Sequence, residues 1–486
     1  MVERRDDHLG VPLGKPLEEQ AVQEFAANFR GELVRPEDEG YDIARAVFNA
    51  MTDRRPALIA RCTGVADVVA AVNFARENEL VVAVRGGGHS VPGYGSCDGG
   101  IVIDLSPMKG VWVDPEARIA RAQGGLTWGE FDRETQHFGL ATTGGRVTHT
   151  GIAGQTLGSG SGWLERKYGL TCDNLISAEV VTADGKFLKA SEEANEDLFW
   201  GLKGGGGNFG VVTSFEYRLH PIGPIVLGGM FMYPFSKAKE LLRFWRDYLE
   251  EEAPDELGTA PGIFTAPPAP FVPEHMRGQL VAAVIVCYAG TVDEAEEVVR
   301  PLREFGPPEV DLVQPMPYTV VQTLVDPANP PGRRNYWKAE NMNELPDEAI
   351  DTLVEQAATI TSPFSVVLIE PKGRAISQVG EAETAIGGRD AAHTLYAFSI
   401  WESPAEDDNH IAWARGFMEA MESYLTPGIS PNFTSDQGQD KVKDFFGRDG
   451  KYERLVALKN KYDPTNLFRL NQNIKPTAPS GAASSS

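Results

Sequence analysis

The spacing of hydrophobic and polar residues changes along the chain and predicts a mixture of helices and strands. Apolar residues recur at helical spacing around Val22, Phe25, Phe29 and Leu33, which predicts that residues 1–55 are largely helical. A strand, an amphipathic helix and a second strand should follow, at Ala57–Arg61, Val65–Asn78 and Val81–Arg85. Further strands are predicted at 100–104, 112–122 and 211–218, a strand-turn-strand at 176–189, and helices at 127–137 and 196–202.

From about residue 222 the pattern becomes one of alternating strands interspersed with amphipathic helices. Leu280–Tyr288 and Ser365–Glu370 are typical strands, whereas Val292–Phe305 and Pro346–Ala358 are typical helices. This arrangement predicts an α+β unit, in which helices cover one face of an antiparallel sheet. The change in pattern places a domain boundary near residue 221.

Glycine is concentrated in the first half of the chain. The motif Arg85-Gly86-Gly87-Gly88-His89-Ser90 allows successive backbone N–H groups to form an anion-binding nest suited to a pyrophosphate. It is neither a GxGxxG fingerprint nor a P-loop, so extended loops would have to hold a dinucleotide.

Residues 144–170 are predicted to be mostly loop because glycine recurs throughout them. Ile152, Leu157, Trp163 and Leu164 interleave with these glycines, which argues against a flexible linker. Two more glycine-rich stretches, Gly169–Asn174 and Lys203–Gly210, follow. Together the glycine-rich segments predict the site of one extended ligand.

Composition narrows the classes of function. A formal net charge of -24 argues against binding to nucleic acid or to anionic membranes. No apolar run approaches the roughly 20 residues that span a bilayer, and the N-terminus lacks the apolar core of a signal peptide. Four cysteines without CxxC spacing predict free thiols, a cytoplasmic location and no metal site. Residues 477–486 should be a disordered tail.

Several motifs together resemble one family. They are RGGGHS, GIAGQTLGSGSGWLERKYGL, DNLISAEVVTADG, DLFWGLKGGGGNFGVVTSFEYRL and YDPTNLFRLNQNI. The chain resembles the vanillyl-alcohol-oxidase superfamily, which has a PCMH-type FAD-binding fold, and within it the berberine-bridge-enzyme-like flavoprotein oxidases. The similarity is strong over about residues 50–220 and moderate over 395–476.

The resemblance implies a two-domain α+β fold. An FAD-binding domain would cover residues 1–221, with a PCMH-type core at about 54–221. A substrate-binding domain with an antiparallel sheet would cover 222–431, and residues 432–476 would return to the FAD domain as a berberine-bridge-like segment.

The resemblance also implies how FAD is held. The histidine of the RGGGHS-type motif bonds to the flavin 8-methyl carbon in this family, which points to His89; a neutral imidazole is a good nucleophile for that bond. Many relatives add a cysteine bond, but Val147 occupies that position here, so we expect a single linkage. His149 is expected to pack near the flavin. The full set of expected cofactor-binding residues is Arg85, Gly86, Gly87, Gly88, His89, Ser90, Gly93, Gly145, Val147, Gly151, Ile152, Gly154, Gly158, Gly160, Trp163, Leu164, Gly169, Asp173, Asn174, Gly210, Val212, Asn432, Asn471 and Asn473.

The sequence identifies the catalytic base less clearly than it identifies the cofactor-binding residues. Relatives often use a tyrosine two residues before an asparagine, where this chain has Ser430, or a glutamate at the position of Thr394. A serine hydroxyl is a poor base without a partner. We favour Tyr396, which shares a strand face with Thr394, while the alternative is a tyrosine packed in the core. Other nearby acid–base residues are His393, Glu370 and Glu402.

The predicted function is therefore FAD-dependent oxidation. Hydride would pass from a small organic substrate (an alcohol, sugar, phenol or secondary metabolite) to flavin N5, and O2 would reoxidise the flavin to give H2O2. Thr150, near the position that gates oxygen in relatives, is not bulky, which favours an oxidase. The alternatives are a dehydrogenase with another electron acceptor and a catalytically silent flavin-binding protein.

Overall fold

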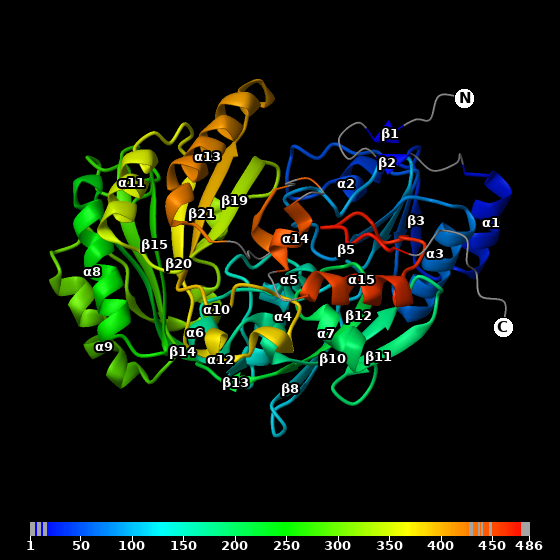
Figure 1. Ribbon diagram of the computed structural model, residues 1–486, viewed down its shortest axis with the longest axis horizontal. Helices are drawn as coiled ribbons and strands as arrows, with labels where there is room; N and C mark the ends of the chain where they lie inside the picture. The colour runs from blue at the N-terminus through cyan, green and yellow to red at the C-terminus, as the bar shows by residue number, and fades with distance from the viewer. Residues whose placement is uncertain are drawn as a thin grey trace.

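The computed structural model describes residues 5–6, 11–12, 17–426, 431–435, 438, 441–446 and 450–477. Figure 1 shows two lobes, with one large sheet at one end of the molecule and two smaller sheets at the other. Ser430 and residues 478–486 lie outside the described residues. Among the described residues, no helix combines the length and the apolar character needed to cross a membrane.

The first small sheet has four strands in the order β3-β4-β6-β5. Strands β4, β5 and β6 are parallel and buried, and α1 and α3 pack together beside them, with the Phe25 and Phe74 rings stacked at 4.4 Å. The bounds are β3 Glu32–Val34, β4 Leu58–Arg61, β5 Val82–Arg85, β6 Ile101–Asp104, α1 Glu19–Asn28 and α3 Val65–Glu77.

The expectation that residues 1–55 are largely helical is only partly correct. Within the described part, helix is confined mainly to α1 and the short α2, Tyr41–Arg45. Leu33, which fits the helical spacing, instead lies in β3 and pairs antiparallel with Ala60. Tertiary pairing with a buried strand outweighs local periodicity here.

The second small sheet has five strands, all antiparallel, in the order β11-β10-β12-β8-β7. The single strand predicted at 112–122 is a hairpin, because Asp114 accepts the backbone N–H groups of Glu116 and Ala117 and turns the chain. Helix α4 begins after Thr127, as expected, in a capping box with Glu130. The bounds are β7 Val111–Asp114, β8 Ile119–Gln123, β10 Leu175–Val181, β11 Phe187–Ser191, β12 Val211–Arg218, α4 Trp128–Gln136 and α7 Glu196–Leu202.

The glycine-rich stretch 144–170 contains more helix than its composition predicts. Two short helices occur there, α5 (Ile152–Gly158) and α6 (Glu165–Tyr168). Ile152 and Trp163 are almost fully buried and anchor the segment, so it is an ordered wall rather than a linker.

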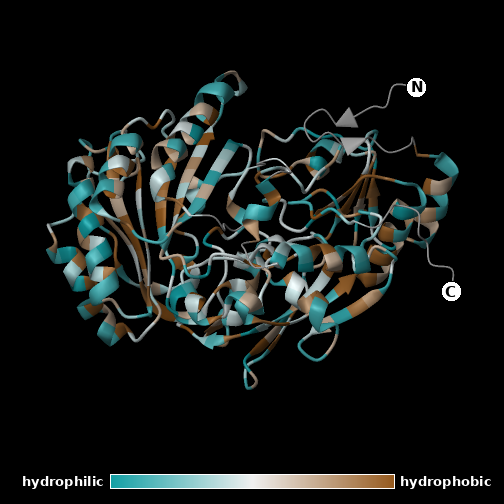
Figure 2. Ribbon diagram, in the orientation of Figure 1, coloured by the Kyte–Doolittle hydropathy of each residue, from teal (hydrophilic) through white to brown (hydrophobic). Residues whose placement is uncertain are grey.

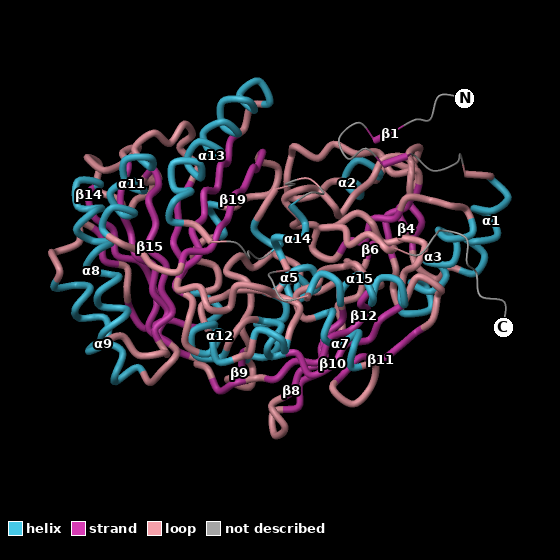
Figure 3. The backbone as a smooth tube through the Cα atoms, viewed as in Figure 1, coloured by secondary structure: helices cyan, strands magenta, loops and turns pink. Residues whose placement is uncertain are grey.

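The large sheet belongs to the second half of the chain. Its order is β17-β14-β16-β15-β20-β21-β19, with β18 paired to β14, and its neighbouring strands are antiparallel. Helices α8, α9, α11 and α13 lie along one side of it (Figures 1 and 3). The bounds are β14 Ile225–Pro234, β15 Leu257–Thr265, β16 Leu280–Tyr288, β17 Val310–Asp311, β18 Gln314–Pro317, β19 Arg334–Met342, β20 Val366–Pro371, β21 His393–Trp401, α8 Ala238–Glu251, α9 Val292–Glu304, α11 Asp347–Ala357 and α13 Asp407–Met421.

The two faces of this sheet have different partners. Alternate residues such as Val367, Ile369 and Leu395 join a core with Trp245 and Phe417 of the covering helices. Figure 2 shows this division, with brown strands behind helices whose outward surfaces are largely teal. The residues between them along the strands point toward the other lobe, on the face that α8, α9, α11 and α13 leave uncovered. That uncovered face supplies one wall of the cavity described below.

The C-terminal segment returns to the first lobe. Helix α15 (Lys451–Tyr462) packs against α7, and the shorter α14 (Val442–Phe445) precedes it (Figure 1). The fully buried ammonium of Lys459 donates to the carbonyls of Asn208 and Phe468, each at 2.8 Å, and to Asp463 at 2.7 Å. Asp463 in turn accepts the N–H groups of Leu467 and Phe468, so one ion pair fixes the course of the final segment.

We expect Lys459→Met to destabilise the protein by about 3–5 kcal/mol, because it leaves the Asp463 carboxylate buried without its cation. The measurement is the midpoint of thermal or urea unfolding. Lys461→Met is the matched control on the same helix. Its ion pair with Asp197 is exposed to solvent, so its loss should cost less than about 1 kcal/mol. Equal shifts for the two variants would contradict the anchoring role of Lys459.

Candidate functional site

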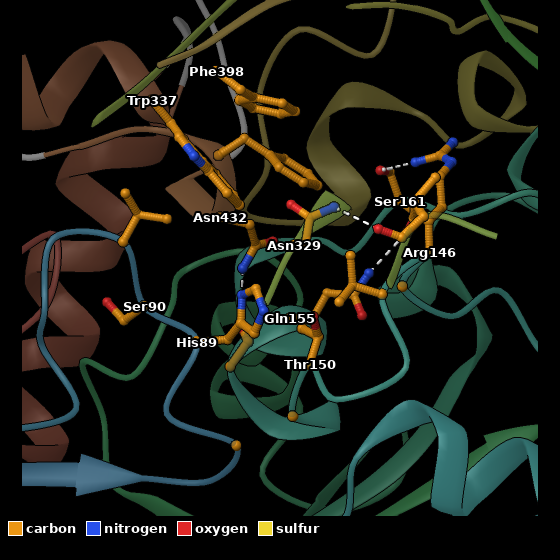
Figure 4. Close-up of a pocket in the computed structure, with 18 of the residues that line it drawn as sticks. His89, Ser90, Arg146, Thr150, Gln155, Ser161, Asn329, Trp337, Phe398 and Asn432 are labelled. Carbon is orange, nitrogen blue, oxygen red and sulfur yellow. Dashed lines mark hydrogen bonds between the residues drawn. The ribbon is translucent and has the colours of Figure 1, made fainter. Parts of the chain in front are cut away.

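A cavity of about 1060 Å³ lies between the two lobes. The glycine-rich loops and α5 form one side, the uncovered face of the large sheet forms another, and the final segment reaches it at Asn471. Figure 4 shows His89, Gln155, Trp337 and Asn432 converging on this space from separate parts of the chain. Such a volume is at the upper end for a single small-molecule site.

The loop after β5 passes very close to the start of α5. A Cβ at Gly87 would lie 2.4 Å from the backbone nitrogen of Gly151, and a Cβ at Gly151 would lie 2.3 Å from the nitrogen of Gly87. Only glycine permits this approach, since a side chain on either residue would separate the two segments. The contact sets the position of the next residues, including His89.

His89 is held against the ring of Phe48. The two rings are stacked with centroids 3.7 Å apart, and the ring of His149 lies 5.0 Å from His89. Burial, reinforced by His149, lowers the pKa of His89 to about 3, so its imidazole is neutral at physiological pH. His149 is fixed by a 3.0 Å hydrogen bond between its Nε2 and the carbonyl of Asn329.

Several buried polar atoms beside the cavity lack a hydrogen-bond partner among the described residues. They include Nε2 of His89, Oε1 of Gln155 and Oδ1 of Asn471. Buried polar groups are normally satisfied, so this set indicates a polar ligand that runs along the cavity. A dinucleotide such as FAD, which carries many polar groups, fits the chemistry of this wall.

Most of the expected cofactor-binding residues line this cavity. They are Arg85, Gly86, Gly87, Gly88, His89, Ser90, Gly145, Val147, Gly151, Gly154, Gly158, Trp163, Gly210, Val212, Asn432 and Asn471. The cavity is also lined by Arg146, Gln155 and Ser161, which the motif analysis did not select. Gln155 lies inside the GIAGQTLG motif. Its polar side chain among apolar and glycine neighbours is the sequence signal that could have identified it as a cavity residue.

The other expected residues do not line the cavity. They are Gly93, Ile152, Gly160, Leu164, Gly169, Asp173, Asn174 and Asn473. Asp173 instead forms a buried ion pair with Arg389 at 2.6 Å, and the Asn174 amide donates to the carbonyl of Leu170 at 3.0 Å. Ile152 is a core residue. These residues support the cavity wall from behind.

A cluster of charges lies where the large sheet faces α6. Glu370 of β20 is paired with Arg146, accepts a hydrogen bond from Ser161 at 3.2 Å, and accepts one from the hydroxyl of Tyr396. Arg146 also pairs with Glu165 at 3.1 Å, and burial raises the pKa of Glu165 to about 7. Among the described residues that line the cavity, Glu370 is the only carboxylate.

Tyr396 differs from the expectation that it faces the substrate. It shares a strand face with Phe398 and Ile400, which line the cavity, but Tyr396 itself does not. The residue is 2% exposed, and burial beside Glu370 raises the pKa of its hydroxyl well above the usual 10. A neutral phenol of this kind donates a hydrogen bond and is a poor proton acceptor.

Thr394 and His393 also lie away from the cavity lining. The hydroxyl of Thr394 donates to Asn341 at 3.0 Å, and burial lowers the pKa of His393 to about 4. Glu402 is largely exposed beyond the end of β21. Of the acid–base residues considered from sequence, Glu370 alone reaches the cavity.

Comparison with known proteins agrees with this geometry. Residues 56–191 match the family described as "FAD binding domain", and residues 431–475 match the family "Berberine and berberine like". The chain is 31% identical over 461 residues to an FAD-linked oxidoreductase of Dictyostelium discoideum, covering 94% of this chain and 97% of that protein.

Two further relatives are oxidases. The (R)-6-hydroxynicotine oxidase of Paenarthrobacter nicotinovorans is 31% identical, covering 92% of this chain and 97% of its own. The crystal structure of a 6-hydroxy-D-nicotine oxidase from Arthrobacter nicotinovorans superposes with a TM-score of 0.82 at 30% identity, covering 92% of this chain and 98% of that one. The expected two-domain α+β fold is thereby confirmed. The chain belongs to the berberine-bridge-enzyme-like FAD-linked oxidases of the vanillyl-alcohol-oxidase superfamily, with a PCMH-type FAD-binding domain.

Proposed function

We propose that this enzyme holds FAD through a single covalent bond to His89 and oxidises a small organic substrate with O2 as electron acceptor. The observation that carries the proposal is the His89 imidazole itself. It is neutral, stacked on Phe48, and presents a buried Nε2 without a partner among the described residues. An imidazole in that state is ready to act as a nucleophile.

A single linkage is supported by the residue at the second attachment position. Val147 lines the cavity at the position where relatives carry a second attachment, and valine offers no nucleophile. The four cysteines, Cys62, Cys97, Cys172 and Cys287, are buried as free thiols, and burial raises the pKa of each. Thiols held in the protonated state are poor nucleophiles toward the cofactor.

FAD, when bound, supplies the acceptor for hydride at N5. The protein must then take up the proton that the substrate loses. We infer that Glu370 is the proton acceptor, since it is the one carboxylate on the described cavity wall. Arg146 and Ser161 hold its carboxylate in place, and Tyr396 acts through Glu370 as a positioning residue rather than as the base expected from sequence.

Oxygen completes the cycle by accepting two electrons and two protons to give H2O2. Thr150 lines the cavity near the position that gates oxygen in the family, and its small side chain favours access. The second candidate is a dehydrogenase that uses another electron acceptor. A third is a flavin-binding protein without catalytic activity, which a complete absence of turnover would indicate. The presence of Glu370 beside the substrate space favours an active enzyme.

The choice of acceptor can be measured directly. We expect air-saturated enzyme, given a substrate that bleaches its visible flavin absorbance under anaerobic conditions, to consume O2 and release one H2O2 per substrate. Reoxidation should be faster than substrate-driven reduction. Rapid reduction followed by slow reaction with O2 and fast reaction with an artificial dye would favour the dehydrogenase.

We expect acid-precipitated protein to stay yellow, and mass spectrometry of its peptides to find one flavin linkage, at His89. All four cysteines should react with an alkylating reagent after unfolding. His89→Ala should release its FAD on precipitation, because no other nucleophile is in place. His149→Ala, which removes the neighbouring imidazole, should keep the bound colour. Free FAD from the wild type, or a cysteinyl adduct, would contradict single attachment.

We expect Glu370→Gln to slow flavin reduction by about 10²–10⁴-fold, the range of general-base catalysis. Tyr396→Phe should slow it by at least about tenfold with FAD still bound, because Glu370 loses one of its donors. Rapid-mixing spectroscopy measures both rates.

The control for this pair is Thr394→Val. Thr394 lies on β21, as Tyr396 does, and pairs in register with Glu370, but it is outside the cavity lining. The loss of its hydroxyl should therefore leave flavin reduction near the wild-type rate. A Glu370→Gln variant that reduces its flavin normally would remove Glu370 from the mechanism.

A further inference from the structure

The cavity extends along the whole of β20. Val366, Leu368 and Glu370 alternate on the strand and all face it, and Phe364, just before the strand, lines it as well. At a rise of about 3.3 Å per residue, Val366 to Glu370 cover roughly 13 Å, and the turn that holds Phe364 adds to this length. The space above the cofactor wall is therefore elongated, with Glu370 at one end and Phe364 at the other.

The wall between those ends is apolar. It consists of Val366 and Leu368 of β20, Phe398 and Ile400 of β21, and Trp337 of β19, and Figure 4 shows Trp337 and Phe398 side by side above the labelled polar residues. A sugar chain would need hydrogen-bond donors and acceptors along such a wall, and the strands offer none there. An apolar body fits better.

Arg333 stands at the Phe364 end. Its guanidinium carbon lies 3.6 Å from the centre of the Phe364 ring, which fixes the plane of the group against the cavity wall. Its nearest carboxylate is Glu402, at 3.7 Å from Nε, and Glu402 is 68% exposed. Within the described part of the chain, Glu402 is the one polar partner that the structure gives to the Arg333 guanidinium.

The other arginines on the described cavity wall are neutralised. Arg85 is paired with Asp104 at 2.8 Å, and Arg146 with Glu165 and Glu370. Of the arginines on the described wall, Arg333 has only the exposed carboxylate of Glu402, at 3.7 Å, so its donors remain available to a ligand. A guanidinium matches a carboxylate with two parallel hydrogen bonds, and stacking on an aromatic ring holds it ready for that geometry.

We propose that Arg333 is a specificity residue that binds the carboxylate of an elongated, otherwise apolar substrate, whose oxidised carbon lies toward Glu370. This inference rests on the proposed function for the identity of the reacting end. It assigns the substrate class as an apolar organic acid rather than a sugar. The net charge of -24 slows the approach of any anion, so the selectivity arises from the local contact.

The test uses the holoenzyme and two probes of the same shape, 4-phenylbutyrate and its neutral amide. Isothermal titration calorimetry should show that the wild type binds the acid at least about tenfold more tightly than the amide, the strength of a partly desolvated ion pair. Arg333→Met keeps the apolar stem over Phe364 and should reduce affinity for the acid to that for the amide, with affinity for the amide unchanged. Arg333→Gln is the second variant and should give the same result.

Arg415→Gln is the matched control, because Arg415 also lies over an aromatic ring, Tyr336, but on the helix-covered side of the same sheet. It should retain the preference for the acid. Equal affinities for acid and amide in the wild type, or a preference that survives in both Arg333 variants, would overturn the proposal. Flavin content and acid-stable colour are read on the same samples, so a failure of the proposed cofactor chemistry would be seen separately from a failure at Arg333.

Discussion

The close contact of two backbones at Gly87 and Gly151 is the constraint on which the site depends. It brings the loop after β5 against the start of α5, two segments more than 60 residues apart in the chain. His89 follows directly and is then held between Phe48 and His149. A single added methyl group at either glycine would push the loop away and move His89 from the cavity wall. Ring stacking and the depressed pKa of His89 both follow from this approach.

Much of the first lobe could be predicted from sequence because its signals are local. The strand, helix and strand at 58–85, the capping box at Thr127 and the strands at 175–191 each follow from spacing or cap chemistry within a few residues. The RGGGHS loop was equally visible, since glycine runs have few structural uses. Predictions failed where tertiary contacts determine the secondary structure. In β3, pairing with β4 gives a strand where a helix was expected.

The substrate end of the site could be predicted only in outline. Arg146 and Glu370 are 224 positions apart, and no spacing rule connects a residue in a glycine-rich loop with one on a distant strand. Strand alternation puts Tyr396 on the same strand face as Phe398, but it could not show that the Tyr396 hydroxyl donates to Glu370 and does not line the cavity. The contacts of the loop at 326–329 could not be predicted for the same reason. Thr148 donates to Asp326, and His149 forms a hydrogen bond with Asn329, each between the two lobes. Such pairs become visible only when both lobes are in place.

The return of the final segment has a consequence for the order of assembly. Asn208, beside the glycine-rich turn after α7, donates to the carbonyl of Gln472, 264 positions later, and the adjacent Asn471 lines the cavity. Chains are synthesised at about 5–20 residues per second, so the first lobe emerges tens of seconds before the residues that close its cavity. The cavity wall is therefore complete only after this final segment has been made.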